Sequence, residues 1–377
     1  MRIILLLVAS LLASAAARAA PQTYPSSAGP LAVDTVASGL VHPWSLAFLP
    51  DGRMLVTERP GRMRIVSRGG KLSKPLAGVP HVWAHSQAGL MDVILDRHFT
   101  DNHTIYFSYD APDNGGGRID IARAKLDESG LRLTDVKAIF RQKGPPDHGA
   151  NTGCRIVQAK NGDLYASQGD HFSDKKMAQS LDNDIGKIIR IRPDGAIPPD
   201  NPFLHKKDAR PEIWAYGVRN PEGLAFNPFN GQLWEQEHGP KGGDEINIIR
   251  KGANYGWPVV SLGVNYDGTP VGTGKQHHAG MADPVWHWTP SIAPSGMAFY
   301  TGTLFPQWKG SLFNGALKYE LVSRLTLEGD KVVKEERILH GLHQRIRFVA
   351  QGPQDGALYL LTDEPHGRIL RVTPAKH

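Results

Sequence analysis

The sequence repeats one local pattern six times, and this repetition limits the folds that the chain can adopt. Each copy reads as a strand, a turn built on glycine, proline or aspartate, a second strand, another turn and a third strand. The copies begin with WSLAFLPDGRMLVTERPGRMRIV (Trp44), GLMDVILD (Gly89), GCRIVQAKNGDLYASQGD (Gly153), NPEGLAFNPFNGQLWEQEHG (Asn220), APSGMAFYTG (Ala293) and IRFVAQGPQDGALYLLTDE (Ile346). Their starts are spaced by roughly 45 to 75 residues.

Repeated all-strand units of this length predict an all-β chain, a six-bladed β-propeller of four-stranded antiparallel blades. The fourth strand of each blade would lie in the less regular intervals between copies. Strand signals begin near Leu31 and stop near Val372, so the closing blade would combine both ends of the chain. Helical periodicity is nearly absent, although LDNDIGKII could hold one turn. The alternative is a β-sandwich or barrel, but six similar cassettes are difficult to produce by accident.

The first twenty residues have the layout of a cleavable secretory signal: Arg2, the apolar core IILLLVASLLA and the small-residue stretch SAAARAA. The predicted organisation is a signal peptide over 1–20, a flexible lead-in over 21–34 and a single propeller domain over 35–377. No later stretch is long and apolar enough to cross a bilayer. We therefore expect a soluble protein that is periplasmic or secreted.

Composition excludes several functional classes. The net charge is +6, but lysine and arginine are scattered without the basic stripe of a nucleic-acid binder. Cys154 is the only cysteine, so an intramolecular disulfide is impossible. No glycine-rich phosphate cradle opens a helix and no GxSxG serine elbow occurs, so neither a nicotinamide or flavin fold nor a serine hydrolase is indicated.

Three polar groups are candidates for chemistry. The cluster EHGPKGGDEINII, from Glu237, has the glycines and carboxylates that calcium uses, and Gly239-Pro240 exposes adjacent carbonyls. An acidic turn between two strands is the competing interpretation. Asp147-His148 and Asp170-His171 place a histidine beside a carboxylate, as a general base requires. With 16 histidines in the chain, a surface role for any one of them is the simpler interpretation.

Basic residues on the later repeats form the third group: Lys318, Arg345 and Arg347. Arg345 and Arg347 are two apart on a predicted strand, so both would point to one face. Two guanidiniums directed at the channel would suit a ligand with several carboxylates. A solvated strand face explains them equally well.

Taken together, the first repeat, QAGLMDVILD, YGVRNPEGLAF, EHGPKGGDEINII, NYGWP and PSIAPSGMAFY closely resemble the soluble quinoprotein glucose/sorbosone dehydrogenases, in particular the periplasmic aldose sugar dehydrogenases. The resemblance covers about residues 35 to 373. It implies a six-bladed propeller that holds pyrroloquinoline quinone (PQQ) and calcium at the mouth of its channel. It also implies oxidation of aldoses at the anomeric carbon to lactones, with electrons passed to an external acceptor.

The resemblance implies roles for individual residues. The implied cofactor-binding residues are Gln87 on the substrate side, Asp147, Arg219, Asn220, Lys318, Arg345 and Arg347. The carbonyls of Gly239 and Pro240 would hold one calcium, and Glu245 with the carbonyl of Tyr255 a second, for which Asp267 is a further candidate. The implied catalytic residues are His148, which takes the proton of the anomeric hydroxyl, its partner Asp170, and Arg219, which stabilises charge on the quinone oxygen.

The sequence departs from the family pattern in two places. The segment GANTGC between His148 and Arg155 is longer than in the aldose dehydrogenases compared, which affects the alignment of His148. Trp286 fills one place of an aromatic pair found in the glucose-specific branch, but Thr289 stands at the other, so the pocket is expected to be more open. Two other functions compete: a propeller that binds without catalysis, and a calcium-dependent sugar lactonase. A lactonase has no use for the basic set, and a non-catalytic propeller would be expected to lose several of the candidate site residues that this chain retains. The chain is expected to be a monomer or homodimer.

Overall fold

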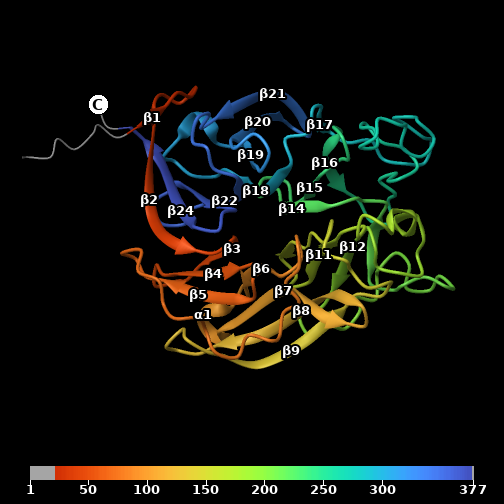
Figure 1. Cartoon of the computed structure of the whole chain (residues 1–377), viewed down its shortest axis with the longest axis horizontal. Helices are drawn as coiled ribbons and strands as arrows, with labels where there is room; N and C mark the ends of the chain where they lie inside the picture. Colours follow the sequence, from red (N-terminus) through yellow and green to blue (C-terminus); the bar gives the residue numbers. More distant parts are fainter. Residues whose placement is uncertain (1–21, 376–377) are drawn as a thin grey trace, which may run out of the picture.

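The computed structural model describes residues 22–375 and shows six antiparallel sheets arranged around a central axis (Figure 1). The prediction of a six-bladed β-propeller is confirmed. The predicted signal peptide, residues 1–20, lies outside the described residues. Each repeat found in the sequence begins at the innermost strand of one blade.

The first five blades follow each other along the chain. Blade 1 contains β3 (Pro43–Phe48), β4 (Met54–Glu58) and β5 (Arg62–Val66). Blade 2 contains β6 (Leu90–Leu95), β7 (Thr104–Asp113), β8 (Gly116–Leu126) and β9 (Leu133–Arg141). Blade 3 contains β10 (Ile156–Gln158), β11 (Leu164–Gln168), β12 (Lys187–Ile191) and β13 (Ile213–Tyr216). Blade 4 contains β14 (Pro221–Phe226), β15 (Leu233–Glu237), β16 (Asp244–Ile249) and β17 (Trp286–Trp288). Blade 5 contains β18 (Pro294–Phe299), β19 (Leu312–Ala316), β20 (Val322–Glu328) and β21 (Lys331–Ile338).

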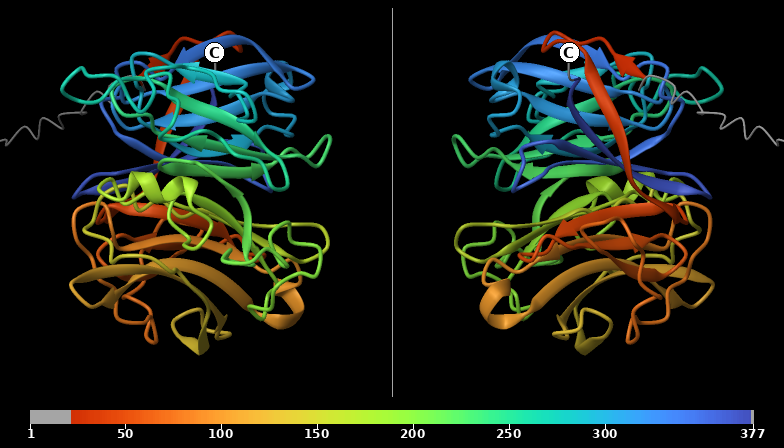
Figure 2. Two further views of the ribbon diagram at one scale, coloured as in Figure 1. Left: turned by 90° about the vertical axis from the view of Figure 1, so that its right-hand side faces the viewer. Right: turned by 90° about the vertical axis from the view of Figure 1, so that its left-hand side faces the viewer.

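The closing blade joins the two ends of the chain, as predicted. It contains β22 (Ile346–Gln351), β23 (Leu358–Thr362), β24 (Gly367–Pro374), β2 (Leu31–Leu40) and the short β1 (Thr23–Tyr24). Strand β2 runs antiparallel to β24 along nearly its whole length, and Figure 2 shows the red and blue strands side by side. Because first and last segments share one sheet, unfolding of either end would open the ring.

Within residues 22–375, helical structure is limited to three short pieces: α1 (Phe99–Asn102) and the 3₁₀ turns η1 (Lys175–Gln179) and η2 (Pro306–Trp308). None of the helices in residues 22–375 is long and apolar enough to cross a membrane.

The inner strands β3, β6, β10, β14, β18 and β22 each contact the next, and β22 contacts β3, which closes the ring. Neighbouring strands within a blade are antiparallel. The loops that enter each first strand and those that join second to third strands therefore lie on one face, which we call the site face. The turns that join first to second strands lie on the opposite face, the turn face.

Apolar layers between neighbouring blades form the core. Leu55 and Met63 of blade 1 pack against Val93 and Phe107 of blade 2, and all four are buried. The same arrangement recurs around the ring, for example with Trp234 of blade 4 against blade 5. A fully buried side chain of this kind contributes about 1.5–3 kcal/mol. Sheets covered on both faces explain the nearly continuous apolar runs in the repeats.

The structure corrects three expectations. Blade 1 has three strands, with a single bridge between Val66 and Leu72 in place of a fourth, and the closing blade has five. Residues 22–34 are not a featureless lead-in, because they form β1 and the start of β2, and Tyr24 is buried. The segment LDNDIGKII holds no helical turn; η1 precedes it and β12 begins within it.

Candidate active site

The predicted site residues gather on the site face. All those in loops lie in connections that the topology assigns to this face: Gln87, Asp147, His148, Asp170, Arg219, Asn220, Gly239, Pro240, Lys318 and Arg345. Short polar loops that follow rigid strands hold such residues firmly, which is how a propeller presents a site. Glu245 and Arg347 lie within β16 and β22, and Tyr255 lies in the long loop between β16 and β17.

The loops of Gln87 and His148 are joined directly. The Gln87 backbone N–H donates to the carbonyl of Gly149 at 2.9 Å, and its side-chain Oε1 accepts from the Asn151 N–H at 2.8 Å. The His148 side chain is exposed. Its imidazole is therefore accessible to a substrate on this face.

A pair of buried carboxyl groups, Asp110 and Asp147, lies beneath this loop. Burial and the charge of Asp147 raise the pKa of Asp110 well above its usual value. Burial raises the pKa of Asp147 to about 6, although the Gly149 N–H and His148 act in the opposite direction. One oxygen of each carboxyl makes no hydrogen bond. The charge of Asp147 therefore opposes ionisation of Asp110.

Asp170 makes its hydrogen bonds with residues other than His148, the partner that the resemblance implied. Its Oδ1 accepts from the Asn151 side-chain amide and the Phe172 N–H, both at 2.8 Å, and its Oδ2 accepts from the Trp257 indole N–H at 2.7 Å. Among residues 22–375, no hydrogen bond joins Asp170 to His148. Burial raises the pKa of Asp170, while nearby Arg219 lowers it.

His171 lies next to this carboxylate but is buried. Burial, and secondly the charge of His148, lower the pKa of His171 to about 4. It is therefore neutral at pH 7, and of the two neighbouring histidines only His148 is open to solvent.

Arg59, Arg219, Lys318 and Arg345 all lie on the site face and have no carboxylate within salt-bridge distance in the described part of the chain. The buried Nε atoms of Arg59 and Arg219 make no hydrogen bond. Arg219 Nη1 donates to the carbonyls of His238 and Gly239, at 2.9 and 3.0 Å, and Arg345 Nη1 donates to that of Leu317 at 3.0 Å. Positive side chains without a salt-bridge partner fit an anionic ligand with several carboxylates.

Arg347 does not belong to this group. Its Nη1 donates to Glu222 Oε2 at 2.7 Å and its Nη2 to Asp363 Oδ2. It is buried, whereas Arg345 immediately precedes β22 and is half-buried. The guanidinium of Arg347 is already neutralised by the protein, and only its Nε lacks a hydrogen-bond partner.

A charged girdle crosses the channel below the site. Its members are buried and charged: Asp92, Arg155, Glu222, Arg347 and Asp363. Arg155 stacks on the Trp44 ring at 3.8 Å and lies 3.5 Å from Asp92. Burial alone would raise the pKa of Glu222 and of Asp363, but Arg347 brings both below their usual values. The girdle separates the site face from the other mouth of the channel.

Blade 4 holds the opposite arrangement, a carboxylate cluster of Glu235, Glu237 and Glu245. Burial and the neighbouring carboxylates raise the pKa of Glu235 and Glu237 well above normal, and burial raises that of Glu245 to about 7. The buried Glu235 Oε1 has no partner.

Glu237, Glu245 and Tyr255 line a cavity of about 10 Å³, which is the space of one water or ion. These donors fit a hard cation. Gly239, with its carbonyl beside Arg219, lines the same cavity, whereas Asp267 is exposed and accepts from the N–H and hydroxyl of Thr269.

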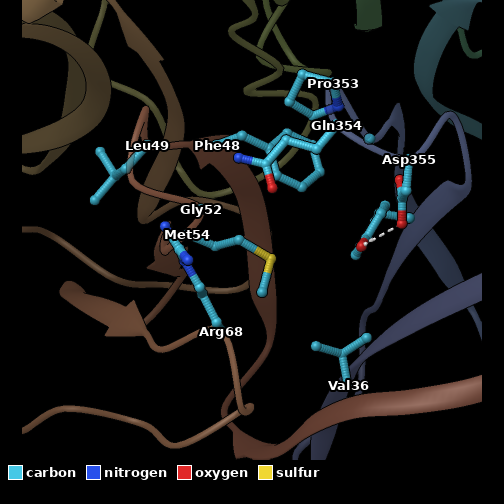
Figure 3. Close-up of a pocket in the computed structure, with 11 residues that line it drawn as sticks. Val36, Phe48, Leu49, Gly52, Met54, Arg68, Pro353, Gln354 and Asp355 are labelled. Atoms are coloured by element: carbon cyan, nitrogen blue, oxygen red, sulfur yellow. Dashed lines mark hydrogen bonds between the residues drawn. The ribbon is translucent and has the colours of Figure 1, made fainter.

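Larger cavities lie on the turn face. One of about 200 Å³ is lined by Phe48, Met54, Arg68 and Tyr359, where blade 1 meets the closing blade (Figure 3). The channel mouth on this face is another, of about 450 Å³, and is mostly apolar. No residue predicted from the sequence to form the site lines either cavity.

Several residues of the site were missed in the sequence. Arg59 directly follows a second strand and Asp110 lies in the last four residues of another, close to the places of Asp170 and Glu237 in their repeats. This shared place in the repeat was the signal that could have found them. Trp257 stands in NYGWP, but nothing local indicates its bond to Asp170. A Cβ on Gly169 would collide with the Asn151 carbonyl, so only glycine permits this approach of the two loops.

Comparisons with known proteins agree with this architecture. The glucose/sorbosone dehydrogenase family model matches residues 40–371. Aldose sugar dehydrogenase YliI of Escherichia coli is 46% identical over 345 residues, which are 91% of this chain and 92% of that protein. The crystal structure of the apo-form of the Escherichia coli soluble aldose sugar dehydrogenase has a TM-score of 0.88 at 44% identity, and covers 92% of this chain and 100% of its own.

The PQQ-bound aldose sugar dehydrogenase of Streptomyces coelicolor has a TM-score of 0.74 at 29% identity, and covers 91% of this chain and 98% of its own. The fold, the order of the motifs and these matches agree over nearly the whole described chain. The chain therefore belongs to the glucose/sorbosone dehydrogenase family.

Proposed function

We propose that this protein is a PQQ-dependent aldose sugar dehydrogenase, which oxidises the anomeric carbon of an aldose to a lactone. The observation that carries the proposal is the set of unpaired cations, Arg59, Arg219, Lys318 and Arg345, on the same face as the exposed His148. A cluster of guanidinium and ammonium groups without carboxylate partners matches a tricarboxylate quinone. The PQQ-bound relative supports the same cofactor.

The residues present fit the cofactor. Arg345, Lys318 and Arg59 would bind its carboxylates, and Arg219 with Asn220 would face its ring, where the Arg219 Nε and Asn220 Oδ1 are unsatisfied. When bound, the quinone would accept the two electrons and the hydrogen of the anomeric carbon. Arg347 would contribute through the girdle, because its charge is neutralised by Glu222 and Asp363.

Calcium is proposed at two places. The carbonyls of Gly239 and Pro240 would hold one ion beside the cofactor, although that of Gly239 also accepts from Arg219 and has one lone pair left. Glu245 and Glu237, with the carbonyl of Tyr255, would hold a second; burial and neighbouring carboxylates raise the pKa of both glutamates, so a bound cation would stabilise their ionised forms.

His148 is the proposed general base. Its exposed imidazole would take the proton from the anomeric hydroxyl, and Asp147 beneath it would stabilise the imidazolium. Gln87, fixed to the same loop, would orient the sugar. Asp170 would act indirectly, by holding Asn151 and Trp257 in place.

The cellular location and the electron acceptor are also part of the proposal. The signal-like N-terminal sequence fits an exported protein, and we propose the periplasm. The reduced cofactor would pass its electrons to an acceptor outside the chain. A non-catalytic propeller or a lactonase would leave the unpaired cations without a ligand.

Reconstitution tests the proposal. The purified protein is titrated with PQQ and calcium, and dye reduction is measured with a panel of aldoses. Activity is expected only with both additions, and His148→Ala should lower kcat by about 10²–10⁴-fold. His98→Ala is the matched control, because His98 is an exposed histidine in a turn-face connection. Failure of the protein to bind PQQ would reject the proposed enzyme function. Full activity of His148→Ala would reject His148 as the general base.

A further inference from the structure

Two exposed aromatic side chains lie next to each other on the site face, with their rings tilted relative to one another. The rings of Phe172 and Tyr266 have centroids 6.2 Å apart with 34° between their planes. Phe172 is 50% exposed and Tyr266 is 61% exposed. With Val264 they are three of the eight large exposed apolar side chains in residues 22–375, so exposure is concentrated here. We call Phe172 and Tyr266 the aromatic pair.

The backbone holds Phe172 outward at a conformational cost. His171 and Phe172 have φ of 54° and 61°, a left-handed conformation that is an outlier for bulky residues. The Phe172 N–H donates to Asp170 Oδ1, which fixes this turn. Each strained residue costs on the order of 1–3 kcal/mol. Exposing an apolar ring by strain is unfavourable for stability, so a role in binding explains it better than packing does.

The long loop that carries Tyr266 is pinned to the site face at two points. The Lys241 N–H donates to the Val264 carbonyl at 3.0 Å, next to the proposed calcium-binding carbonyls. Lys175 Nζ donates to Asn265 Oδ1 at 3.4 Å, which links the loop to the segment after Phe172. The two rings are therefore brought together by contacts from blades 3 and 4.

The chemistry of the pair suits a sugar ring. A pyranose has one face of C–H groups and a rim of hydroxyls, and the electron-rich face of an aromatic ring attracts C–H groups while covering apolar surface. Phe172 lies two residues after Asp170 in the same site-face loop, and its ring is exposed.

We propose that the aromatic pair is a binding subsite for the second sugar ring of disaccharide aldoses. This inference rests on the proposed function and adds a specificity determinant to it. The reducing-end ring would react at His148, and the second ring would stack on Phe172 and Tyr266. The site would then favour disaccharides with a free anomeric carbon over the corresponding monosaccharide in KM.

The test compares maltose and cellobiose with glucose on the reconstituted holoenzyme at saturating dye. In Phe172→Ala and Tyr266→Ala, KM for the disaccharides should rise by about 5- to 10-fold, since loss of one stacking contact changes affinity by this order. Values of kcat, and both constants for glucose, should change less than about twofold. Phe172→Trp should keep a low disaccharide KM.

Phe229→Ala is the matched control. Phe229 is an equally exposed phenylalanine, at 55%, in the turn between β14 and β15 on the opposite face. Its replacement by alanine should change KM neither for glucose nor for the disaccharides. Equal effects of Phe172→Ala on glucose and disaccharides, no effect, or an effect on the KM of the dye would each overturn the subsite.

Saturation-transfer NMR with maltose provides a readout without turnover. The wild-type protein should transfer magnetisation to protons of the non-reducing ring, and the Phe172→Ala/Tyr266→Ala variant should not. Absence of transfer in the wild type would overturn the subsite. Absence of aldose oxidation with intact transfer would instead reject the proposed function and retain a sugar-binding surface.

Discussion

The charged girdle in the channel and the carboxylate cluster in blade 4 are both buried, yet their charges are balanced in opposite ways. In the girdle, Arg347 lies between Glu222 and Asp363 and lowers the pKa of both carboxylates. In the cluster, Glu235, Glu237 and Glu245 face one another and their pKa values are raised. One region is complete by itself, and the other fits an added cation.

The difference separates structural charges from those available for a ligand. A buried carboxylate is stable when a guanidinium and hydrogen bonds replace its water, and is costly otherwise. The girdle therefore maintains the ring of blades, whereas the cluster and the unpaired site-face cations are free to bind. Arginines near the channel are not equivalent, and their salt bridges distinguish them.

The largest expected effect comes from breaking the girdle. Arg347→Met would leave Glu222 and Asp363 buried without their cation, and should lower the free energy of unfolding by about 3–5 kcal/mol. Urea denaturation at pH 7 measures this. Arg345→Met is the control, since half-buried Arg345 makes one side-chain bond to a carbonyl and should cost about 1 kcal/mol. Equal losses of unfolding free energy in the two variants would show that the salt bridges of the girdle do not account for the effect.

A smaller effect is expected when calcium fills the carboxylate cluster. Calcium at a hundredfold its dissociation constant should stabilise the wild type by about 2.7 kcal/mol. Glu245→Gln should lose most of this gain, and chelation by EDTA should remove it from the wild type. Glu328→Gln, at an exposed position in β20, should respond as the wild type does. An unchanged calcium response in Glu245→Gln would place the ion elsewhere.

The smallest effect concerns the carboxyl pair, which resembles the cluster. A carboxyl whose pKa is raised on folding contributes stability below its unfolded pKa of about 4, and this is lost as pH rises through the folded pKa. Asp110→Asn should therefore stabilise the protein at pH 8 by on the order of 1 kcal/mol and give no gain at pH 4. Thermal unfolding at both pH values measures it.

Asp51→Asn is the control for the carboxyl pair. Asp51 lies in an exposed turn and its pKa is lowered, so the change should give no gain at pH 8. A gain for Asp110→Asn at both pH values would mean that packing rather than protonation is responsible.

The girdle carboxylates have lowered pKa values, whereas the carboxylate cluster and the carboxyl pair have raised ones. The stability that the two kinds of group contribute should therefore depend on pH with opposite sign. Stability from Asp363 and Glu222 is present above the unfolded pKa and is lost as pH falls through the folded values. Stability related to Glu245 and Asp147 is lost as pH rises from about 4 to 7.

Local sequence was enough for the blades and for most loop positions of the site. Turn residues such as Pro50-Asp51-Gly52, between alternating or apolar runs, specify a hairpin through their own backbone preferences. The same grammar placed His148, Arg219 and Gly239 in loops. It failed for residues 22–30, because the pairing of Thr23 with Ala32 and the burial of Tyr24 depend on the closing blade.

The sequence by itself determined six strand units, their order and the polar loops between them, because turns and strand alternation are set by neighbours along the chain. Only the tertiary structure decided which charges remain available. Arg347 and Arg345 look alike in QRIRF, yet Glu222 lies 125 positions away from Arg347 and neutralises it across the channel. Asp110 and Asp147 meet because Asp147 pairs with Gly117 in blade 2, and Phe172 and Tyr266 meet because loops of the neighbouring blades 3 and 4 are in contact. Contacts of this kind are set by the arrangement of blades, which no local pattern contains.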